Sequence, residues 1–431
     1  MARVYPFKGY CYNEEKVGDL NKIVTQPYDK IDQNKQDYYY QESDYNIVRL
    51  ILAREEGEQD RYQTAASYLN KWVKEDALVQ DKEPGFYAYW QEYKVEGKKY
   101  TRKGFVGLGK LEGEEGVKAH ENTLEGPKAD RLNLIRATEA NFGHIFMLYS
   151  DPKKTILELL DKGVAERSPA IKVNDEDGNT HLLWKITDQV IIKNIQEAMM
   201  DKTLYIADGH HRYQTAVNYR NECYAKGWQS TDNEGFNHRL MTFINIDDPG
   251  LNILATHRML YGLSNFKIED FIEKARKDFI IQEYDHKDDL FAVLDDNEEH
   301  IFGFKARKDQ RYYSLRLEDN TIMERFLAER SAYWKNLDVV ILHKVILEQY
   351  LGIDEQALAA KSNIDYVRYR ETALNKLAEG NYQAAFILNP TKVAEVKNIA
   401  DENERMPQKS TDFYPKLLTG LVINRLNIKK D

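Results

Sequence analysis

The sequence contains only two cysteines, Cys11 and Cys223, and neither has a partner at metal-binding spacing. This excludes a disulfide framework and a cysteine-based zinc site. No apolar run approaches the roughly 18 residues of a membrane-spanning helix, and the first residues, MARVYPFKGY, lack the apolar centre of a signal peptide. We therefore expect a cytoplasmic protein with no membrane partner.

Several motifs of nucleotide-binding and hydrolytic enzymes are also missing. The chain has no Walker-type glycine-rich loop, no dinucleotide-binding fingerprint, no zinc motif and no nucleophile elbow. Its formal net charge is -10, so the field of the whole molecule opposes binding to nucleic acid or to anionic lipids. The common nucleotide-binding folds are therefore disfavoured, and nucleic acid is not an expected partner.

The composition, 42% hydrophobic and 31% charged, is that of a folded globular protein. The length of 431 residues exceeds the about 250 to 300 that a single core supports, so we expect two domains. The polar stretch WQSTDNEGFN at 228–237 lacks periodicity and concentrates turn-forming residues. We predict an N-terminal domain at 1–232 and a C-terminal domain at 233–431.

Hydrophobic periodicity predicts alternating helices and strands in both domains. Residues 59–73 have apolar side chains at helical spacing, with Asp60 available as a cap. Residues 86–95 and 100–111 alternate apolar with polar side chains around a glycine-containing turn, which is typical of a hairpin. The pattern predicts an α/β (mixed α+β) protein with mixed sheets in two closely packed domains.

The segment TLYIADGHHRYQTAVNYR carries the densest group of chemically active side chains. An apolar strand ends at Asp208, Gly209 permits a tight turn, and a helix is predicted to begin near Tyr213. Such a junction directs backbone N–H groups and the positive end of a helix toward one point, and Arg212 adds donors suited to phosphate or carboxylate. The segment therefore predicts an anion site.

Two further roles are open in this segment. Asp208 can bind a cation or accept a proton, and His210 and His211 can donate hydrogen bonds or act as general acids near neutral pH. The alternative is that Asp208 caps the helix while the histidines form local hydrogen bonds. The position at the end of an α/β strand favours a ligand site.

A second group of polar side chains lies in GVKAHENTLEGPKADR. Glu121 is a candidate base or magnesium ligand, His120 is a further candidate catalytic residue, and Lys128 and Arg131 are candidate phosphate clamps. The alternative is that these charges solvate a surface loop.

Two segments of the predicted C-terminal domain are also candidates. In NILATHRML, His257 and Arg258 interrupt an apolar run, and a buried arginine needs a partner, either a bound anion or a carboxylate of the chain. In ERMPQKSTDFYPKLLTGLV, the basic and hydroxyl groups suit a phosphate loop, although a structural C-terminal lid explains them equally well. The residues concerned are Lys409, Ser410, Thr411 and Lys416.

Near the start of the chain, VTQPYDKI places Pro27, Tyr28 and Asp29 in a turn. A structural role for this turn is favoured slightly over a catalytic one.

These motifs together resemble the bacterial and archaeal domain of unknown function 1015 family. The matching segments are, in order, TQPYDKI, HENT with GPKADR, YIADGHHRYQTA, ATHRML and MPQKSTDFYPKLLTGLV. The DGHHR motif also resembles that of the superfamily of the partitioning protein ParB, sulfiredoxin and the free serine kinases. This resemblance implies a ParB/sulfiredoxin-like element in the N-terminal half whose strand-to-helix turn holds nucleotide phosphates. Glu121 is assigned by analogy to the glutamate that those kinases use.

The function expected from these features is a phosphotransferase acting between ATP or ADP and a small hydroxylated metabolite, and the resemblance implies free serine. Arg212, Lys128, Arg131 and Arg258 would hold phosphates, and Asp208 or Glu121 would hold Mg²⁺ or deprotonate the hydroxyl. One alternative is a nucleotide-gated, ParB-like binding protein. Another is a phosphate-ester hydrolase.

Overall fold

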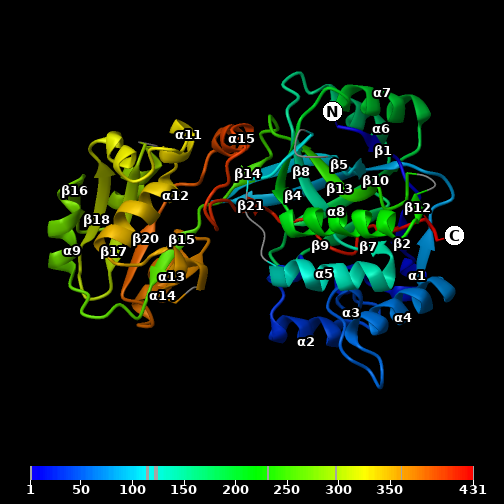
Figure 1. The fold of residues 1–431 in the computed structure, drawn as a ribbon, viewed down its shortest axis with the longest axis horizontal. Coiled ribbons are helices and arrows are strands. Elements are labelled where there is room, and N and C mark those ends of the chain that lie inside the picture. The colour runs from blue at the N-terminus through cyan, green and yellow to red at the C-terminus, as the bar shows by residue number, and fades with distance from the viewer. Residues whose placement is uncertain are drawn as a thin grey trace. The chain divides into compact units, whose positions relative to one another are not determined.

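The computed structural model describes residues 2–112, 116–120, 125–230, 233–296, 299–360 and 362–430. The chain divides into two compact units, unit 1 (Met1–Asn252 and Pro415–Asp431) and unit 2 (Ile253–Tyr414). Both units combine helices with strands, which confirms the predicted mixed α/β class (Figure 1).

This division differs from the predicted boundary at 232/233. Strand β13 (His238–Asn245) follows that boundary in the sequence, yet it pairs with β5 and β8 in the sheet of unit 1. The chain leaves unit 1 only after Asn252 and returns to it at Pro415. A polar segment that leads into a strand of the same unit can have the same composition as a linker, so the local sequence does not distinguish the two.

Unit 1 is built on a nine-stranded mixed sheet. Its order is β6 (Val117–Lys118), β11 (Leu204–Asp208), β8 (Ile145–Tyr149), β13, β5 (Lys98–Lys110), β4 (Phe86–Val95), β10 (Thr180–Ile186) and β9 (Ile171–Asn174), and β1 (Val4–Tyr5) pairs with β5. The pairs β8–β13 and β6–β11 are parallel, and the other pairs are antiparallel. Asp208 lies opposite Phe146, so the turn that follows β11 is beside the start of β8.

Ten helical segments belong to unit 1 in the described part of the chain. They are α1 (Glu14–Val17), η1 (Leu20–Lys22), η2 (Tyr28–Lys30), α2 (Gln33–Glu42), α3 (Val48–Ile51), α4 (Arg61–Lys74), α5 (Glu125–Thr138), α6 (Thr155–Val164), α7 (Gln189–Met199) and α8 (His210–Ala225). Helix α8 packs on β8, α5 packs on α8, and α4 packs on α5, whereas α6 and α7 pack on each other and against β1, β4, β5 and β10. Three further strand pairs are β2 (Tyr10–Tyr12) with β3 (Leu78–Gln80), β7 (Ala140–Asn141) with β22 (Asn424–Arg425), and β12 (Gln229–Ser230) with β23 (Ile428–Lys429).

Local sequence signals explain several of these elements. Asp60 caps α4 by accepting from the backbone of Gln63, whose side chain bonds back to Asp60, as expected for the predicted helix. Strands β4 and β5 form the predicted hairpin, and their turn, Glu96-Gly97, has positive φ at both residues. A left-handed pair of this kind matches the twist of adjoining strands, and glycine adopts it without strain.

Unit 2 contains a six-stranded antiparallel sheet. Its order is β16 (Phe279–Tyr284), β18 (Tyr312–Leu317), β17 (Ile301–Ala306), β20 (Ala384–Ile387), β15 (His257–Leu260) and β19 (Ile364–Val367). Its helical segments are α9 (Ile268–Ala275), α10 (Lys287–Asp295), η3 (Asn320–Arg325), α11 (Ala332–Lys335), α12 (Asp338–Ile341), η4 (Leu342–Tyr350), α13 (Glu355–Ala360), α14 (Arg370–Ala378) and α15 (Val393–Asp401). The short strands β14 (Asn252–Ile253) and β21 (Phe413–Tyr414) lie at the two points where the chain passes between units.

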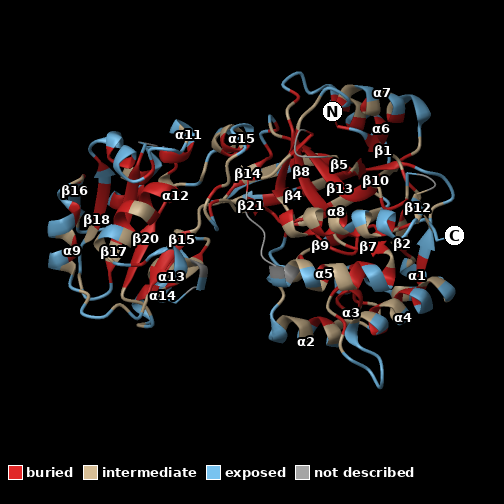
Figure 2. Cartoon of the chain, in the orientation of Figure 1, coloured by how far each residue is buried: buried red, intermediate tan, exposed pale blue. Residues whose placement is uncertain are grey.

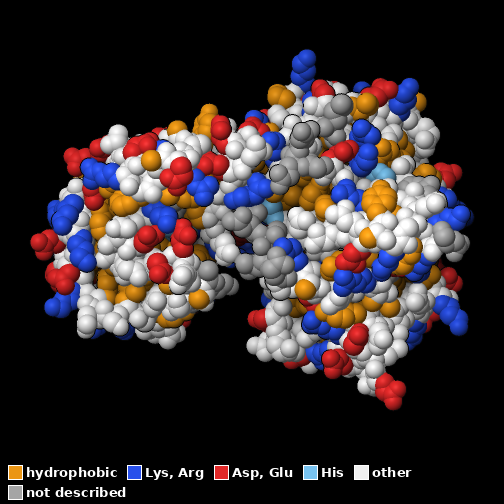
Figure 3. All heavy atoms as spheres, viewed as in Figure 1, with side chains coloured by type: hydrophobic (Ala, Val, Ile, Leu, Met, Phe, Trp, Pro, Cys, Tyr) orange, Lys and Arg blue, Asp and Glu red, His pale blue; other side chains and the backbone are white. Residues whose placement is uncertain are grey.

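Each unit has its own apolar core. Strands β8 and β13 are buried along their whole length (Figure 2). Side chains of these strands join those of α6 and α7 in the core of unit 1. On the face drawn in Figure 3, Lys and Arg side chains are interspersed with Asp and Glu. Among the described residues, no helix is both long and apolar enough to cross a membrane.

Candidate functional site

The turn between β11 and α8 has the predicted strand-turn-helix geometry. Gly209 occupies the N-cap position with φ 96° and ψ 27°, a left-handed conformation that glycine adopts most readily. A Cβ atom there would lie 3.0 Å from the Arg212 guanidinium, so a side chain at this position would also force Arg212 to shift. Helix α8 begins at His210, earlier than the predicted Tyr213, and both histidines therefore belong to its first turn.

Asp208 is the carboxylate at the centre of this turn. Its Oδ2 accepts a hydrogen bond from Arg212 Nη2 at 2.7 Å, and its Oδ1 lies 3.7 Å from Lys416 Nζ. Burial alone would raise the pKa of Asp208, but Lys416, Arg212, His210 and Lys30 outweigh it and lower the pKa from 3.8 to about 2. A carboxylate with so low a pKa is a weak base, which favours a charge-holding role for Asp208 over proton abstraction.

The low pKa of Asp208 makes a pH dependence testable. The ionised form stabilises the folded state by about 2 kcal/mol above pH 4, and this contribution is lost as pH falls through the folded pKa of about 2. In urea unfolding, Asp208→Asn should therefore be less stable than the wild type at pH 7, with a difference that shrinks as pH falls from 4 toward 2. A difference that is constant over this range would contradict the assignment.

Arg212 forms hydrogen bonds within the protein, in addition to its predicted role as a phosphate ligand. The side chain is only 9% exposed, and its Nη1 donates to the His144 carbonyl while Nη2 donates to Asp208. These two hydrogen bonds fix the turn to the start of β8. Arg212 therefore holds the site together, and a contact of this side chain with phosphate remains a prediction.

The two histidines of the motif have different surroundings. His210 is buried, its ring meets that of His120 edge to face at 4.7 Å, and the His120 backbone N–H lies 3.4 Å from His210 Nε2. His211 is partly exposed, and its pKa lies below the ordinary 6.5 because burial, with the charges of Lys128 and Arg212, outweighs the opposing charges of Asp29 and Asp208. The structure thus brings His120 of the HENT motif to the DGHHR turn, whereas Glu121 lies outside the described residues.

The rest of the second predicted cluster also adjoins the turn. The charge of Lys128 lowers the pKa of His211, and the Lys128 carbonyl accepts a hydrogen bond of 3.5 Å from Thr215 Oγ1 of α8. Arg131 is paired with its neighbour Asp130, donates to the Ile51 carbonyl at 2.8 Å and lies over the Tyr28 ring. Lys128 is therefore better placed than Arg131 to contact a ligand at the start of α8.

One segment near the site was not predicted to have a functional role. Segment η2 contains Tyr28, Asp29 and Lys30, and the sequence favoured a structural over a catalytic role for this turn. In the structure, the charge of Lys30 lowers the pKa of Asp208, and the charge of Asp29 raises the pKa of His211. Because these residues lie far from DGHHR in the sequence, only the fold, or the order of motifs in the family, could have indicated their proximity.

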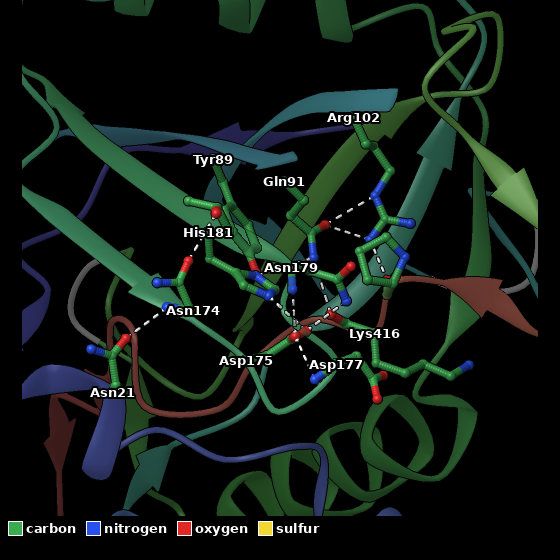
Figure 4. A network of polar contacts seen from close by, with 12 residues as sticks. Asn21, Tyr89, Gln91, Arg102, Asn174, Asp175, Asp177, Asn179, His181 and Lys416 are labelled. Atoms are coloured by element: carbon green, nitrogen blue, oxygen red, sulfur yellow. Dashed lines mark hydrogen bonds and ion pairs between the residues drawn. The ribbon is translucent and has the colours of Figure 1, made fainter. Parts of the chain in front are cut away.

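Lys416 reaches Asp208 because a buried polar network holds its backbone (Figure 4). Gln91 Nε2 donates to the Lys416 carbonyl at 3.0 Å, and Gln91 Oε1 accepts from Arg102 Nε at 3.0 Å. Arg102 also donates to the Pro415 carbonyl, and His181 Nδ1 lies 3.3 Å from Gln91 Nε2. These three side chains are cross-strand neighbours on β4, β5 and β10, so the sheet itself positions the segment that carries Lys416.

The other predicted phosphate ligands lie in unit 2. They are His257, Arg258, Lys409, Ser410 and Thr411. Arg258 is 1% exposed and donates to the carbonyls of Thr256 and Lys409, and no described carboxylate contacts it. Burial, together with the charge of Arg258, lowers the pKa of His257 to about 3. The Ser410 hydroxyl donates to the Pro407 carbonyl, and the Ser410 carbonyl accepts from the Thr391 hydroxyl. Within unit 2 these contacts support a structural role, and phosphate binding there remains a prediction.

A protein-held magnesium site is not evident among the described residues. They include no group of three His, Cys, Asp or Glu side chains arranged to hold a metal ion. Asp208 supplies one carboxylate, and its oxygens already face Arg212 and Lys416. Mg²⁺ commonly binds through one or two carboxylates together with substrate phosphates, so it would depend here on a phosphate ligand.

Several solved structures are similar to this chain at low sequence identity. A free serine kinase mutant in complex with AMP is 12% identical over 72% of this chain and 87% of that chain, with a TM-score of 0.36. A conserved hypothetical protein from Pyrococcus furiosus is 12% identical over 72% and 91% of the two chains, with a TM-score of 0.34. SbnI with a C-terminal truncation, from Staphylococcus aureus, is 10% identical over 73% and 85%, with a TM-score of 0.35. Similarity at this level transfers no residue role to this chain.

None of the curated proteins compared with the sequence matches it significantly. A family model described as a protein of unknown function (DUF1015) matches residues 4–340. This range covers most of the 431 residues and includes all of the motifs described above except the last. The chain therefore belongs to the DUF1015 family.

Proposed function

We propose that unit 1 binds nucleotide phosphates at the start of α8 and transfers a phosphoryl group between ATP or ADP and a small hydroxylated metabolite, with free serine as the first candidate. The observation that carries this proposal is the group of lysines around one turn. The charges of Lys30 and Lys416 lower the pKa of Asp208, and the charge of Lys128 lowers the pKa of His211. Phosphoryl transfer depends mainly on positioning and on neutralising charge, which such a group supplies.

The turn itself is suited to phosphate. Helix α8 extends from His210 to Ala225, and the backbone N–H groups of its first turn carry the positive end of the helix dipole. Gly209 at the N-cap has no side chain that could occupy the space in front of the helix. The DGHHR motif belongs, by resemblance, to a superfamily in which this turn holds nucleotide phosphates.

The transfer step can be assigned to groups around the turn. The acceptor hydroxyl oxygen attacks the terminal phosphorus, the bond from phosphorus to the bridging oxygen of the nucleotide breaks, and the hydroxyl proton passes to a base. His211 is suited to accept this proton because its lowered pKa leaves the imidazole neutral at pH 7. Glu121 is the second candidate by analogy. The lysines would stabilise the charge on the transferred group and on the departing nucleotide.

The proposal is tested by incubating the full chain with ATP or ADP and serine, with and without added Mg²⁺, and measuring phosphoserine by mass spectrometry. We expect phosphoserine to form, and His211→Ala to lower turnover by roughly 10² to 10⁴, the usual contribution of a general base. The matched control is His286→Ala, which removes an exposed histidine of unit 2 and should not change turnover.

Other outcomes would distinguish the alternatives. Nucleotide hydrolysis that does not depend on serine would indicate a hydrolase. Binding of nucleotide without any turnover would favour a nucleotide-gated binding protein. The absence of both turnover and a nucleotide-induced thermal shift would refute the proposal.

A further inference from the structure

Unit 1 contains a cavity beside the turn that opens to solvent. Three arginines line it, Arg131, Arg212 and Arg239, and apolar side chains including Ile135 and Phe142 form much of the rest of its wall. Pockets for small molecules typically combine apolar walls with a few polar groups in this way.

The three arginines differ in how their charges are balanced. Arg131 is paired with Asp130 and Arg212 with Asp208. Arg239 has no carboxylate partner among the described residues, and its Nη2 donates only to the Gly143 carbonyl at 3.1 Å. Its Nε and Nη1 atoms are buried and make no hydrogen bond in the described part of the chain, although the residue is only 7% exposed.

An uncompensated guanidinium in this position is energetically unfavourable. Burial, and secondarily the charge of Arg212, lowers the pKa of Arg239 to about 9. Buried cations are normally paired, and buried N–H donors are normally satisfied, because each exception costs free energy. An anion in the cavity would reduce the first of these costs, since it would neutralise the charge of Arg239.

We infer that this cavity binds a small organic anion whose carboxylate or phosphate group pairs with Arg239 and whose apolar part lies against Ile135 and Phe142. The apolar wall favours an organic anion over an inorganic ion, because the wall would bury the body of the ligand. The inference does not depend on nucleotide binding, because Arg239 is not among the residues that surround Asp208 at the turn. Arg212 belongs to both places, since it bonds Asp208 and also lines the cavity.

The test is isothermal titration of the full chain with octanoate, with inorganic phosphate and with octanol as the uncharged analogue. We expect octanoate to bind the wild type more tightly than octanol does, and Arg239→Met to weaken octanoate binding by roughly 10- to 100-fold, the usual loss when a charged hydrogen-bonding partner is removed. The control Arg3→Met removes one positive charge from a half-exposed side chain of unit 1 and should not change binding.

Arg239→Met should fold, because methionine preserves the apolar stem and removes an uncompensated buried charge, so its Tm should equal or exceed that of the wild type. Should that variant fail to fold, Arg239→Lys keeps the charge, removes most donors and is expected to weaken octanoate binding. Phosphate binding that is lost in these variants would also support an oxyanion site, with an inorganic source. The inference is overturned if neither anion binds the wild type, or if binding is unchanged by both substitutions.

Discussion

Lys416→Met is expected to weaken ADP or ATP binding by roughly 10- to 150-fold, the equivalent of about 1.5 to 3 kcal/mol for a hydrogen bond to a charged group. Lys416 is nearly buried, and its Nζ atom lies 3.7 Å from Asp208 at the start of α8. Its position is set by its backbone carbonyl, which accepts from Gln91, so methionine should leave the local path of the chain unchanged. The affinity is measured by titration calorimetry at fixed ionic strength, since salt screens such contacts.

The matched control for Lys416→Met is Lys193→Met. Lys193 is 75% exposed on α7 and pairs only weakly with Glu197, so its loss should leave both stability and nucleotide affinity unchanged. Equal affinities for the wild type and Lys416→Met would mean that the phosphates do not lie beside Lys416.

Gln91→Leu is expected to lower the free energy of unfolding by about 3 kcal/mol and the Tm by roughly 6 to 12 °C. Gln91 is 1% exposed, and leucine removes the acceptor of Arg102 and the donor of the Lys416 carbonyl while filling a similar volume. Each buried polar group that loses its partner costs about 1 to 3 kcal/mol, and more for a charged one. Urea and thermal unfolding measure this loss.

Gln91→Leu should also reduce nucleotide affinity, because the network that positions Lys416 is broken. Gln189→Leu is the control, since Gln189 is exposed on α7 and its amide bonds only the carbonyl of Thr187. A Gln91→Leu variant with wild-type stability would show that the network contributes nothing to the fold. A loss of stability with unchanged nucleotide affinity would show that the network supports the fold but does not contribute to nucleotide binding.

The strand-turn-helix at Asp208–Arg212 could be predicted from the sequence because each of its signals is local. An apolar run, a glycine and a helical pattern follow one another within one segment, and a similar argument predicted α4 and the β4–β5 hairpin. The first turn of α8 begins earlier than expected because His210 and His211 carry no helix-specific pattern of their own.

The residues that surround the turn could not be predicted, because segments distant in the sequence bring them to it. Lys30, Gln91 and Arg102 lie at separate places in the sequence, and only the sheet order and the return of Pro415 to unit 1 relate them to Asp208. Gln91 and Arg102 occupy alternating positions of hairpin strands, where the pattern does not indicate which polar side chains are buried. The unpaired state of Arg239 is likewise a property of its surroundings, not of its own strand.

The most direct test of the account is a structure of the full chain with bound ADP or ATP. We predict that the phosphates lie at the first turn of α8, within hydrogen-bonding distance of the backbone at His210 and His211 and close to Lys416. Phosphates bound at any other place would contradict the central claim that the turn after β11 is the nucleotide site.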